Sequence, residues 1–230
     1  MSGSIVSPDL RARVRGLAEP IARGFGRLGL TPNHLTLIGF GIAIIAAAAA
    51  AQQQWLAAGL LVIVGGIFDL FDGALARATG RVSKLGAFFD SVFDRWGEGV
   101  VYVGIAWGCA NAGFIEGAVL ATAALASAVM VSYTRAKSES LGFTPGSGMA
   151  NVGLAPREVR LVLLTIGLIG TGAAGGIELI CDRGFGGCAP AGLEHPGASV
   201  LQLALGLITL LATITTIQRI LHVRAQAREG

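Results

Sequence analysis

The sequence has 230 residues, of which 53% are hydrophobic and 13% charged, and its mean hydropathy is +0.68. A soluble domain carries about a quarter charged residues, so this composition excludes an ordinary cytosolic globule, and it also excludes a disordered chain. The formal charge of +3 is spread among long apolar runs, which excludes a nucleic-acid-binding face. At roughly 20 residues per crossing, the length allows about six membrane-spanning helices in a single domain over residues 1–230.

Residues 8–29 predict an amphipathic helix ahead of the first apolar run. Apolar side chains recur there at spacings of three and four, at Leu10, Val14, Leu17, Ile21, Phe25 and Leu28. Arginines fill the remaining face, so we expect this helix to lie in the cytoplasmic membrane interface, with a bend at Pro20. The first 16 residues lack an apolar core, and no cleaved signal peptide is expected.

Six apolar segments follow the amphipathic helix. They cover about 35–52, 55–78, 84–111, 114–140, 156–175 and 198–222. Several connections are very short, which is typical of antiparallel neighbours in a tight bundle. Alanine is abundant and glycine occurs 35 times in the chain, and small residues allow membrane helices to approach closely. The sequence therefore predicts an all-α integral membrane protein with six transmembrane helices after an interfacial helix.

The distribution of lysine and arginine predicts the orientation. With six crossings, sixteen of the 17 basic residues fall on one side of the membrane, and Arg183 alone falls on the other. Loops rich in basic residues stay in the cytoplasm. We therefore expect both termini to face the cytoplasm, in the cell membrane.

Four aspartates interrupt two of the apolar segments, at Asp69, Asp72, Asp90 and Asp94. Ionisable groups at membrane depth cost several kcal/mol unless they are paired, hydrated or metal-bound, so they indicate a functional site. One pair is three residues apart and the other four, so each pair shares one face of its helix. A short hairpin between the two helices would bring both pairs together.

Four clustered carboxylates repel one another and need a cation. Ligation by oxygen atoms alone favours a hard divalent ion, Mg²⁺ or Mn²⁺, which keeps open positions for substrate phosphates. Gly73 allows a ligand to approach the backbone, and Arg77 offers a fork of donors to a phosphate. The alternative is neutralisation of the aspartates by nearby basic residues, namely Arg77, Arg81, Lys84 and Arg95.

The block over residues 69–94 resembles the complete signature of the CDP-alcohol phosphatidyltransferases. It reads Asp-x-x-Asp-Gly-x-x-Ala-Arg, eight residues, Gly86, three residues, Asp90, three residues and Asp94. The resemblance extends to the interfacial helix, a T-P-N-H-L-T stretch before the first span, six spans and a basic C-terminus.

The resemblance implies a homodimeric membrane enzyme that uses an alcohol acceptor to displace CMP from a CDP-linked lipid. By position, Asp69, Asp72, Asp90 and Asp94 would bind one or two metal ions, and Asp94 would also be the general base. The positions that would contact the CDP-lipid are Asn33, His34, Thr36, Gly73, Arg77 and Ser83.

The acceptor is indicated by basic residues at the cytoplasmic ends of the last three predicted spans. The stretches S-Y-T-R-A-K-S-E, P-R-E-V-R-L and Q-R resemble those of actinobacterial phosphatidylinositol-phosphate synthases. That resemblance implies that Arg135, Arg160 and Arg219 hold the phosphate of inositol phosphate, with Arg135 standing where a lysine is expected. Cytoplasmic anchoring is the alternative role of these arginines. Archaeal enzymes share much of the pattern, so the lipid substrate is CDP-diacylglycerol or an archaeal-type CDP-lipid.

Other functions remain open from the sequence. Within the same family, the acceptor could instead be glycerol 3-phosphate or serine. A divalent-cation transporter would account for the aspartates, but it would leave Gly73 and Arg77 without a role. An aspartate-rich prenyltransferase also uses two Asp pairs with Mg²⁺, but its pairs usually carry Asn and lie further apart in sequence.

Overall fold

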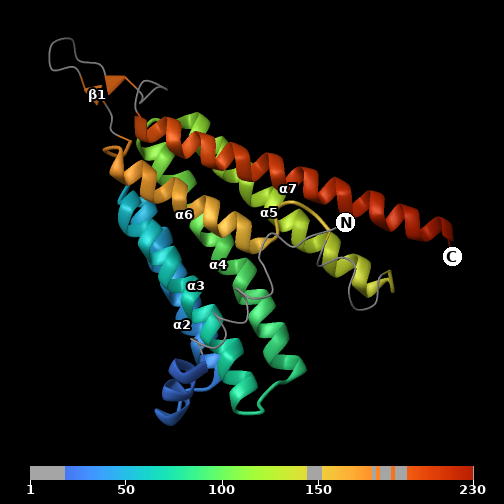
Figure 1. Cartoon of the computed structure of the whole chain (residues 1–230). Coiled ribbons are helices and arrows are strands. Elements are labelled where there is room, and N and C mark those ends of the chain that lie inside the picture. Colours follow the sequence, from blue (N-terminus) through green and yellow to red (C-terminus); the bar gives the residue numbers. More distant parts are fainter. Residues whose placement is uncertain (1–18, 144–151, 178–179, 182–187, 190–195, 230) are drawn as a thin grey trace.

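The computed structural model describes residues 19–143, 152–177, 180–181, 188–189 and 196–229. The described chain is helical apart from one two-residue antiparallel hairpin (Figure 1). Its elements are α2 (Pro32–Ala51), α3 (Trp55–Ala78), α4 (Lys84–Asn111), α5 (Ile115–Ser140), α6 (Arg157–Ala173), β1 (Ile180–Cys181), β2 (Cys188–Ala189) and α7 (Pro196–Glu229). All six predicted helices are confirmed, and α7 extends several residues beyond its predicted end.

The six long helices form a closed circuit. Helix α2 packs against α3 and α4, α3 packs against α6, α6 against α7, α7 against α5, and α5 against α4. Figure 1 shows α2, α3 and α4 together at one end of the molecule and the long α7 running beside α5. Long arginine side chains at the start of α6 reach α3 and α4, so polar residues of these three helices can share one site.

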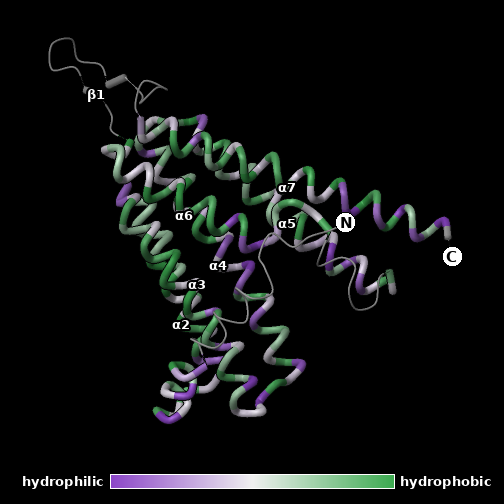
Figure 2. Tube along the Cα trace, viewed as in Figure 1, coloured by the Kyte–Doolittle hydropathy of each residue, from purple (hydrophilic) through white to green (hydrophobic). Residues whose placement is uncertain are grey.

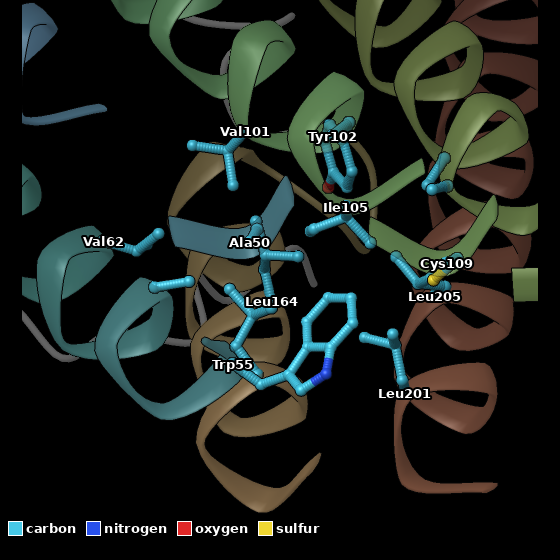
Figure 3. Close-up of a cluster of buried hydrophobic side chains, with 14 of the residues drawn as sticks. Ala50, Trp55, Val62, Val101, Tyr102, Ile105, Cys109, Leu164, Leu201 and Leu205 are labelled. Atoms are coloured by element: carbon cyan, nitrogen blue, oxygen red, sulfur yellow. The ribbon is translucent and has the colours of Figure 1, made fainter. Parts of the chain in front are cut away.

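The main core lies inside the circuit and is drawn in Figure 3. Trp55, Tyr102 and Leu164 are each at most 1% exposed, and they come from α3, α4 and α6. Leu201 and Leu205 of α7 complete this cluster (Figure 3). Helices surrounded by lipid gain stability from such close packing, because lipid tails offer no hydrophobic driving force between helices.

Close approach of α2 and α4 depends on glycine. A Cβ atom at Gly104 would lie 2.2 Å from the carbonyl oxygen of Ala47, a contact that no side chain could make. A Gly104→Ala change would therefore push the two backbones apart. The close contact thus lies between the second half of α4 and the second half of α2.

The turn between α3 and α4 is defined by local hydrogen bonds. Gly80 has φ +65°, a conformation that favours glycine. Ser83 caps α4, and its hydroxyl accepts a hydrogen bond of 3.0 Å from the amide of Gly86. This tight connection between α3 and α4 brings both aspartate pairs to the same end of the bundle.

Four helices, α2, α3, α5 and α7, are long and apolar enough to cross a membrane by length and composition. Within the described part of the chain, α4 and α6 do not qualify. Charged residues occupy the first half of α4, and α6 has only 17 residues. Four of the six predicted spans are thus candidate membrane-spanning helices, and six spans remain a prediction. Figure 2 shows hydrophobic residues along most of the bundle, with hydrophilic ones gathered at the α3–α4 turn and the end of α7.

The predicted amphipathic helix over residues 8–29 is described only from residue 19. Residues 19–27 are helical, while the part before residue 19 lies outside the described chain. Ala22 is fully buried against Leu35, Ala74 and Leu75. This segment therefore packs on the ends of α2 and α3 that adjoin the α3–α4 turn.

Candidate active site

The four aspartates lie on α3 and α4, which are consecutive helices in the sequence. Asp69 and Asp72 are in the second half of α3, and Asp90 and Asp94 are in the first half of α4. Asp69 and Asp90 are each within electrostatic range of both Asp72 and Asp94. The predicted meeting of the two pairs is thus seen in the structure, although no three Asp, Glu, His or Cys side chains of the described residues converge on a single metal position.

Arg157 joins the two helices. Its Nη2 donates to Oδ2 of Asp69 at 2.6 Å, and its Nη1 donates to Oδ2 of Asp94 at 2.7 Å. Arg157 is the first residue of α6, directly after the cap residue Pro156. A guanidinium group from a third helix thus lies between one aspartate of each pair.

Asp72 is held by α2. The hydroxyl of Thr36 donates to Oδ2 of Asp72 at 2.7 Å, and both side chains belong to residues only 4% exposed. A charge-assisted bond of this length fixes the orientation of the carboxylate. Thr36, which the sequence assigned to the CDP-lipid, therefore contacts the aspartate set directly.

The donor set fits a hard divalent cation. The four carboxylates belong to one aspartate set, and Arg157 and Arg95 are the basic residues that contact Asp94. Oδ1 of Asp94 is buried and has no hydrogen-bond partner among the described residues, so it retains an acceptor position for a ligand. Oxygen ligands of this kind suit Mg²⁺ or Mn²⁺.

The predicted CDP-lipid residues lie at one end of the bundle. Asn33 and His34 are in the first turn of α2, where His34 forms a reciprocal capping box with Thr31. Oδ1 of Asn33 lies beside Gly86, next to the hydroxyl of Ser83. The end of α3 adds the exposed Arg77, whose guanidinium lies over the backbone of Gly73. Asn33 and Ser83 are thus neighbours, and Gly73 and Arg77 form a second group one turn from Asp69 and Asp72.

Arg160, a predicted acceptor residue, is fully buried. Its Nε and Nη2 donate to the two carboxylate oxygens of Glu98 at 2.8 and 2.7 Å. Its Nη1 donates to the carbonyl oxygen of Ala155 at 3.0 Å. Every nitrogen of this guanidinium therefore already has a protein partner.

The other two predicted acceptor residues differ from each other. Arg219 is 4% exposed, and it donates from Nε to the Val152 carbonyl oxygen at 3.1 Å and from Nη1 to that of Val131. Arg135 is exposed and pairs with Glu139 at 2.8 Å, one turn away on the same helix. Among the three predicted acceptor residues, Arg135 is thus the one whose guanidinium group is accessible.

A continuous basic cluster connects these residues to the aspartates. Arg219 is within electrostatic range of Arg135, Arg160 and Arg95. Arg95 is in turn within range of Arg157 and lies 3.9 Å from Asp94, measured between Nη1 and Oδ2. We call Arg95, Arg135, Arg160 and Arg219 the basic cluster. It adjoins the aspartate set at Asp94.

The sequence predicted no site role for Arg157 or Glu98, and it indicated Arg95 only as an alternative counterion of the aspartates. The four-residue spacing of Asp90 and Asp94 continues to Glu98, so helical periodicity places it on the same face. Arg157 precedes Arg160 by three residues and shares its helix face for the same reason. That Arg157 reaches the aspartates depends on the packing of α6 against α3, which sequence spacing does not reveal.

A pocket opens beside these groups, between α2, α3, α4 and α6. Its polar lining is provided by Thr36, Asp69, Asp94, Glu98 and Arg157. Its remaining wall is small or apolar and includes Gly39, Ala43, Val62, Val101 and Leu164. The carboxylates therefore face a partly dry space, where electrostatic interactions are stronger than in water.

Comparisons with known proteins agree with this arrangement. Residues 29–225 match the profile of the CDP-alcohol phosphatidyltransferase family. The chain is 37% identical to the archaetidylinositol phosphate synthase of Pyrococcus horikoshii over 171 residues, which cover 74% of this chain and 86% of that protein. It is 33% identical to the phosphatidylinositol phosphate synthase of Streptomyces avermitilis over 225 residues, which cover 96% of this chain and 83% of that protein.

Solved structures of Mycobacterium tuberculosis phosphatidylinositol phosphate synthase have the same fold. The crystal structure with CDP-DAG bound superposes with a TM-score of 0.72 at 26% identity, covering 90% of this chain and 92% of that one. The complex with manganese and citrate gives a TM-score of 0.71 at 27% identity, covering 90% and 88%. The aspartate set, the fold and the match over most of the chain agree, and this protein belongs to the CDP-alcohol phosphatidyltransferase family of enzymes.

Proposed function

We propose that this protein transfers the phosphatidyl group of CDP-diacylglycerol to a hydroxyl group of inositol phosphate and releases CMP. One observation carries the proposal: the basic cluster adjoins the aspartate set at Asp94, with Arg95 between them. An acceptor with its phosphate at the basic cluster would therefore have a hydroxyl within reach of a carboxylate. The names of the archaeal and actinobacterial relatives support the same acceptor.

In the proposed reaction, Asp94 is the general base. Its unpartnered Oδ1 accepts the proton of the attacking hydroxyl. The acceptor oxygen forms a bond to the phosphorus that carries the diacylglycerol, and the bridging bond from this phosphorus to CMP breaks. Asp69, Asp72, Asp90 and Asp94 would hold one or two divalent ions, Mg²⁺ or Mn²⁺. When bound, such an ion would stabilise the negative charge on the diphosphate.

The remaining predicted residues position the substrates. Arg77, with its guanidinium over Gly73, donates to the diphosphate, and Asn33, His34 and Ser83 bind the CDP part at the start of α2 and α4. Thr36 keeps Asp72 in its orientation.

The members of the basic cluster have different proposed roles because their side chains differ in exposure. Arg135 is accessible, so it contacts the acceptor phosphate through its fork. Arg160 and Arg219 are buried and already bind protein groups, so they contribute positive electrostatic potential to the acceptor site from within the protein.

We also propose the membrane arrangement that the basic residues indicate. All six long helices cross the membrane, the polar half of α4 faces the site and not lipid, and both termini and the active site face the cytoplasm. Sixteen of 17 basic residues lie on the cytoplasmic side in this arrangement. Two copies form a homodimer, as the family resemblance implies.

An assay of CMP release tests the function. Purified protein in detergent is given radiolabelled CDP-diacylglycerol, Mg²⁺ and one acceptor at a time: inositol phosphate, glycerol 3-phosphate, serine or free inositol. We expect CMP and labelled lipid product with inositol phosphate, and none from the matched control Asp94→Asn. Turnover with another acceptor alone would overturn the acceptor assignment. An absence of CMP release with every acceptor, also from an archaeal-type CDP-lipid, would overturn the proposed reaction.

A further inference from the structure

Arg157 contacts the aspartate set in the way that a bridging cation would. Its two Nη atoms donate to Oδ2 of Asp69 and of Asp94, one carboxylate from α3 and one from α4, at 2.6 and 2.7 Å. Asp69 and Asp94 both belong to the aspartate set that would hold a divalent ion. A divalent ion held by Asp69 and Asp94 would lie close to this guanidinium group, and the two positive charges would repel each other.

The ion pairs of Arg157 are not fully satisfied. Nε of Arg157 and Oδ1 of Asp94 are both buried without a hydrogen-bond partner among the described residues. A buried ion pair offsets its desolvation only when its remaining hydrogen-bonding groups are also satisfied. A ligand that satisfies the carboxylates better can therefore displace the guanidinium group of Arg157. Arg160 differs, because its three guanidinium nitrogens all have partners.

The backbone that carries Arg157 is fixed independently of its side chain. The hydroxyl of Thr215 on α7 accepts hydrogen bonds from the amides of Leu154 and Ala155, at 3.0 and 2.9 Å. The carbonyl oxygen of Ala155 is bound by Arg160 as well. The guanidinium of Arg157 can therefore leave the aspartates by side-chain rotation, while the start of α6 stays in place.

We propose that Arg157 is the internal counterion of the metal-free enzyme and that it competes with the divalent ion for Asp69 and Asp94. In the metal-free protein Arg157 keeps the two carboxylates together and prevents their repulsion from separating α3 and α4. In the metal-bound protein its side chain is released. The inference rests on the metal site of the proposed function, and it adds a positioning residue outside the ligand set.

Metal binding by full-length protein without substrates tests the inference. Mn²⁺ is titrated into wild-type protein and Arg157→Gln in detergent, and free Mn²⁺ is measured by electron paramagnetic resonance. Removal of a competing ion pair should tighten the apparent Kd for Mn²⁺ about tenfold or more. The matched control is Arg95→Gln, which removes a positive charge 3.9 Å from Asp94 without removing a bridge. It should tighten the Kd by no more than about threefold, because a looser pair contributes less.

Thermal unfolding provides a second readout. In the presence of a chelator, Arg157→Gln should unfold at a lower temperature than wild type, since Asp69 and Asp94 then have no counterion. Saturating Mn²⁺ should raise its unfolding temperature by more than it raises that of wild type. Arg157→Lys, which keeps the charge but loses the fork, should fall between the two proteins in both measurements.

The outcomes separate the inference from the proposed function. Equal or weaker Mn²⁺ binding by Arg157→Gln, or an increase matched by Arg95→Gln, would overturn the competition and leave the metal site intact. An absence of Mn²⁺ binding by all three proteins would overturn the metal site and the inference together.

Discussion

Arg160 of α6 binds Glu98 of α4 through two parallel hydrogen bonds of 2.8 and 2.7 Å, and both side chains are at most 3% exposed. The pair lies one helical turn beyond Asp94 along α4. It connects the start of α6 to the helix that carries half of the aspartate set. This geometry makes Arg160 part of the framework of the site as well as a source of positive charge.

Loss of one partner of this pair should be costly. Arg160→Ala leaves the carboxylate of Glu98 buried and unpaired, and we expect a loss of about 3–5 kcal/mol in the free energy of unfolding. The measurement is thermal or denaturant unfolding of purified protein in detergent. The double variant Glu98→Gln/Arg160→Gln removes both charges and should recover a large part of that loss. Equal stability of Arg160→Ala and wild type would contradict the structural role.

Thr36 offers a test of carboxylate orientation. Thr36→Val removes the hydroxyl that donates to Asp72 while keeping the shape of the side chain. We expect kcat to fall about ten- to a hundredfold, in line with a charge-assisted bond of about 1.5–3 kcal/mol, and Thr36→Ser to retain most of the activity. CMP release under saturating substrates is the measurement. If valine and serine variants lost activity equally, the hydrogen bond would not be the cause.

Asp94 is expected to act on the acceptor. Asp94→Asn should abolish turnover, because an amide cannot accept the proton of the attacking hydroxyl. Binding of CDP-diacylglycerol, measured by equilibrium dialysis, should change little. The variants Asp69→Asn, Asp72→Asn and Asp90→Asn should also lose turnover, and all four aspartate variants should weaken Mn²⁺ binding. Turnover by Asp94→Asn near the wild-type rate would exclude Asp94 as the base.

The helices and the aspartate set could be predicted because their signals are local. Apolar runs define α2 to α7 within a few residues except at the end of α7, and the spacing of Asp69 to Asp94 is a property of the sequence itself. Residues 84–98 are different. The charged first half of α4 gives it the composition of a site-lining helix, so only tertiary packing could show what it faces.

The partners of the arginines could not be predicted, because they depend on which helices meet. Arg157, Arg160 and Arg219 lie at the cytoplasmic ends of predicted spans, where positive-inside anchoring explains any of them equally well. The structure distinguishes them by contact: Arg157 binds two aspartates, Arg160 binds Glu98, and Arg219 binds two backbone carbonyl groups. Sequence similarity indicated the three acceptor positions but not the burial of two of them.

The proposed orientation can be tested by cysteine labelling. A cysteine introduced at Lys84, in the α3–α4 turn, should react with an impermeant reagent only after the cells are opened. Cys181 and Cys188 are paired in register on β1 and β2, at the opposite end of the proposed topology, and they should be reached from outside if they are reduced. A background without the native cysteines is the control. Labelling of the Lys84→Cys variant in intact cells would invert the topology.

The acceptor assignment depends most directly on Arg135, since its fork is exposed and its partner Glu139 lies on the same helix. Such an exposed ion pair contributes little to stability, so Arg135→Ala should fold normally. If the fork binds the acceptor phosphate, its loss removes a charge-assisted bond of about 1.5–3 kcal/mol. At about 1.4 kcal/mol per factor of ten, the KM for inositol phosphate should rise roughly ten- to a hundredfold. The KM for CDP-diacylglycerol should hardly change, because its contacts are proposed at the other group of residues around Arg77.

Arg135→Lys keeps the charge and should retain a KM closer to wild type, whereas Glu139→Gln, which frees the fork, should not raise the KM. A pocket for a neutral alcohol requires no charge at this position, so an unchanged KM in Arg135→Ala would overturn the phosphorylated acceptor while leaving the family assignment in place.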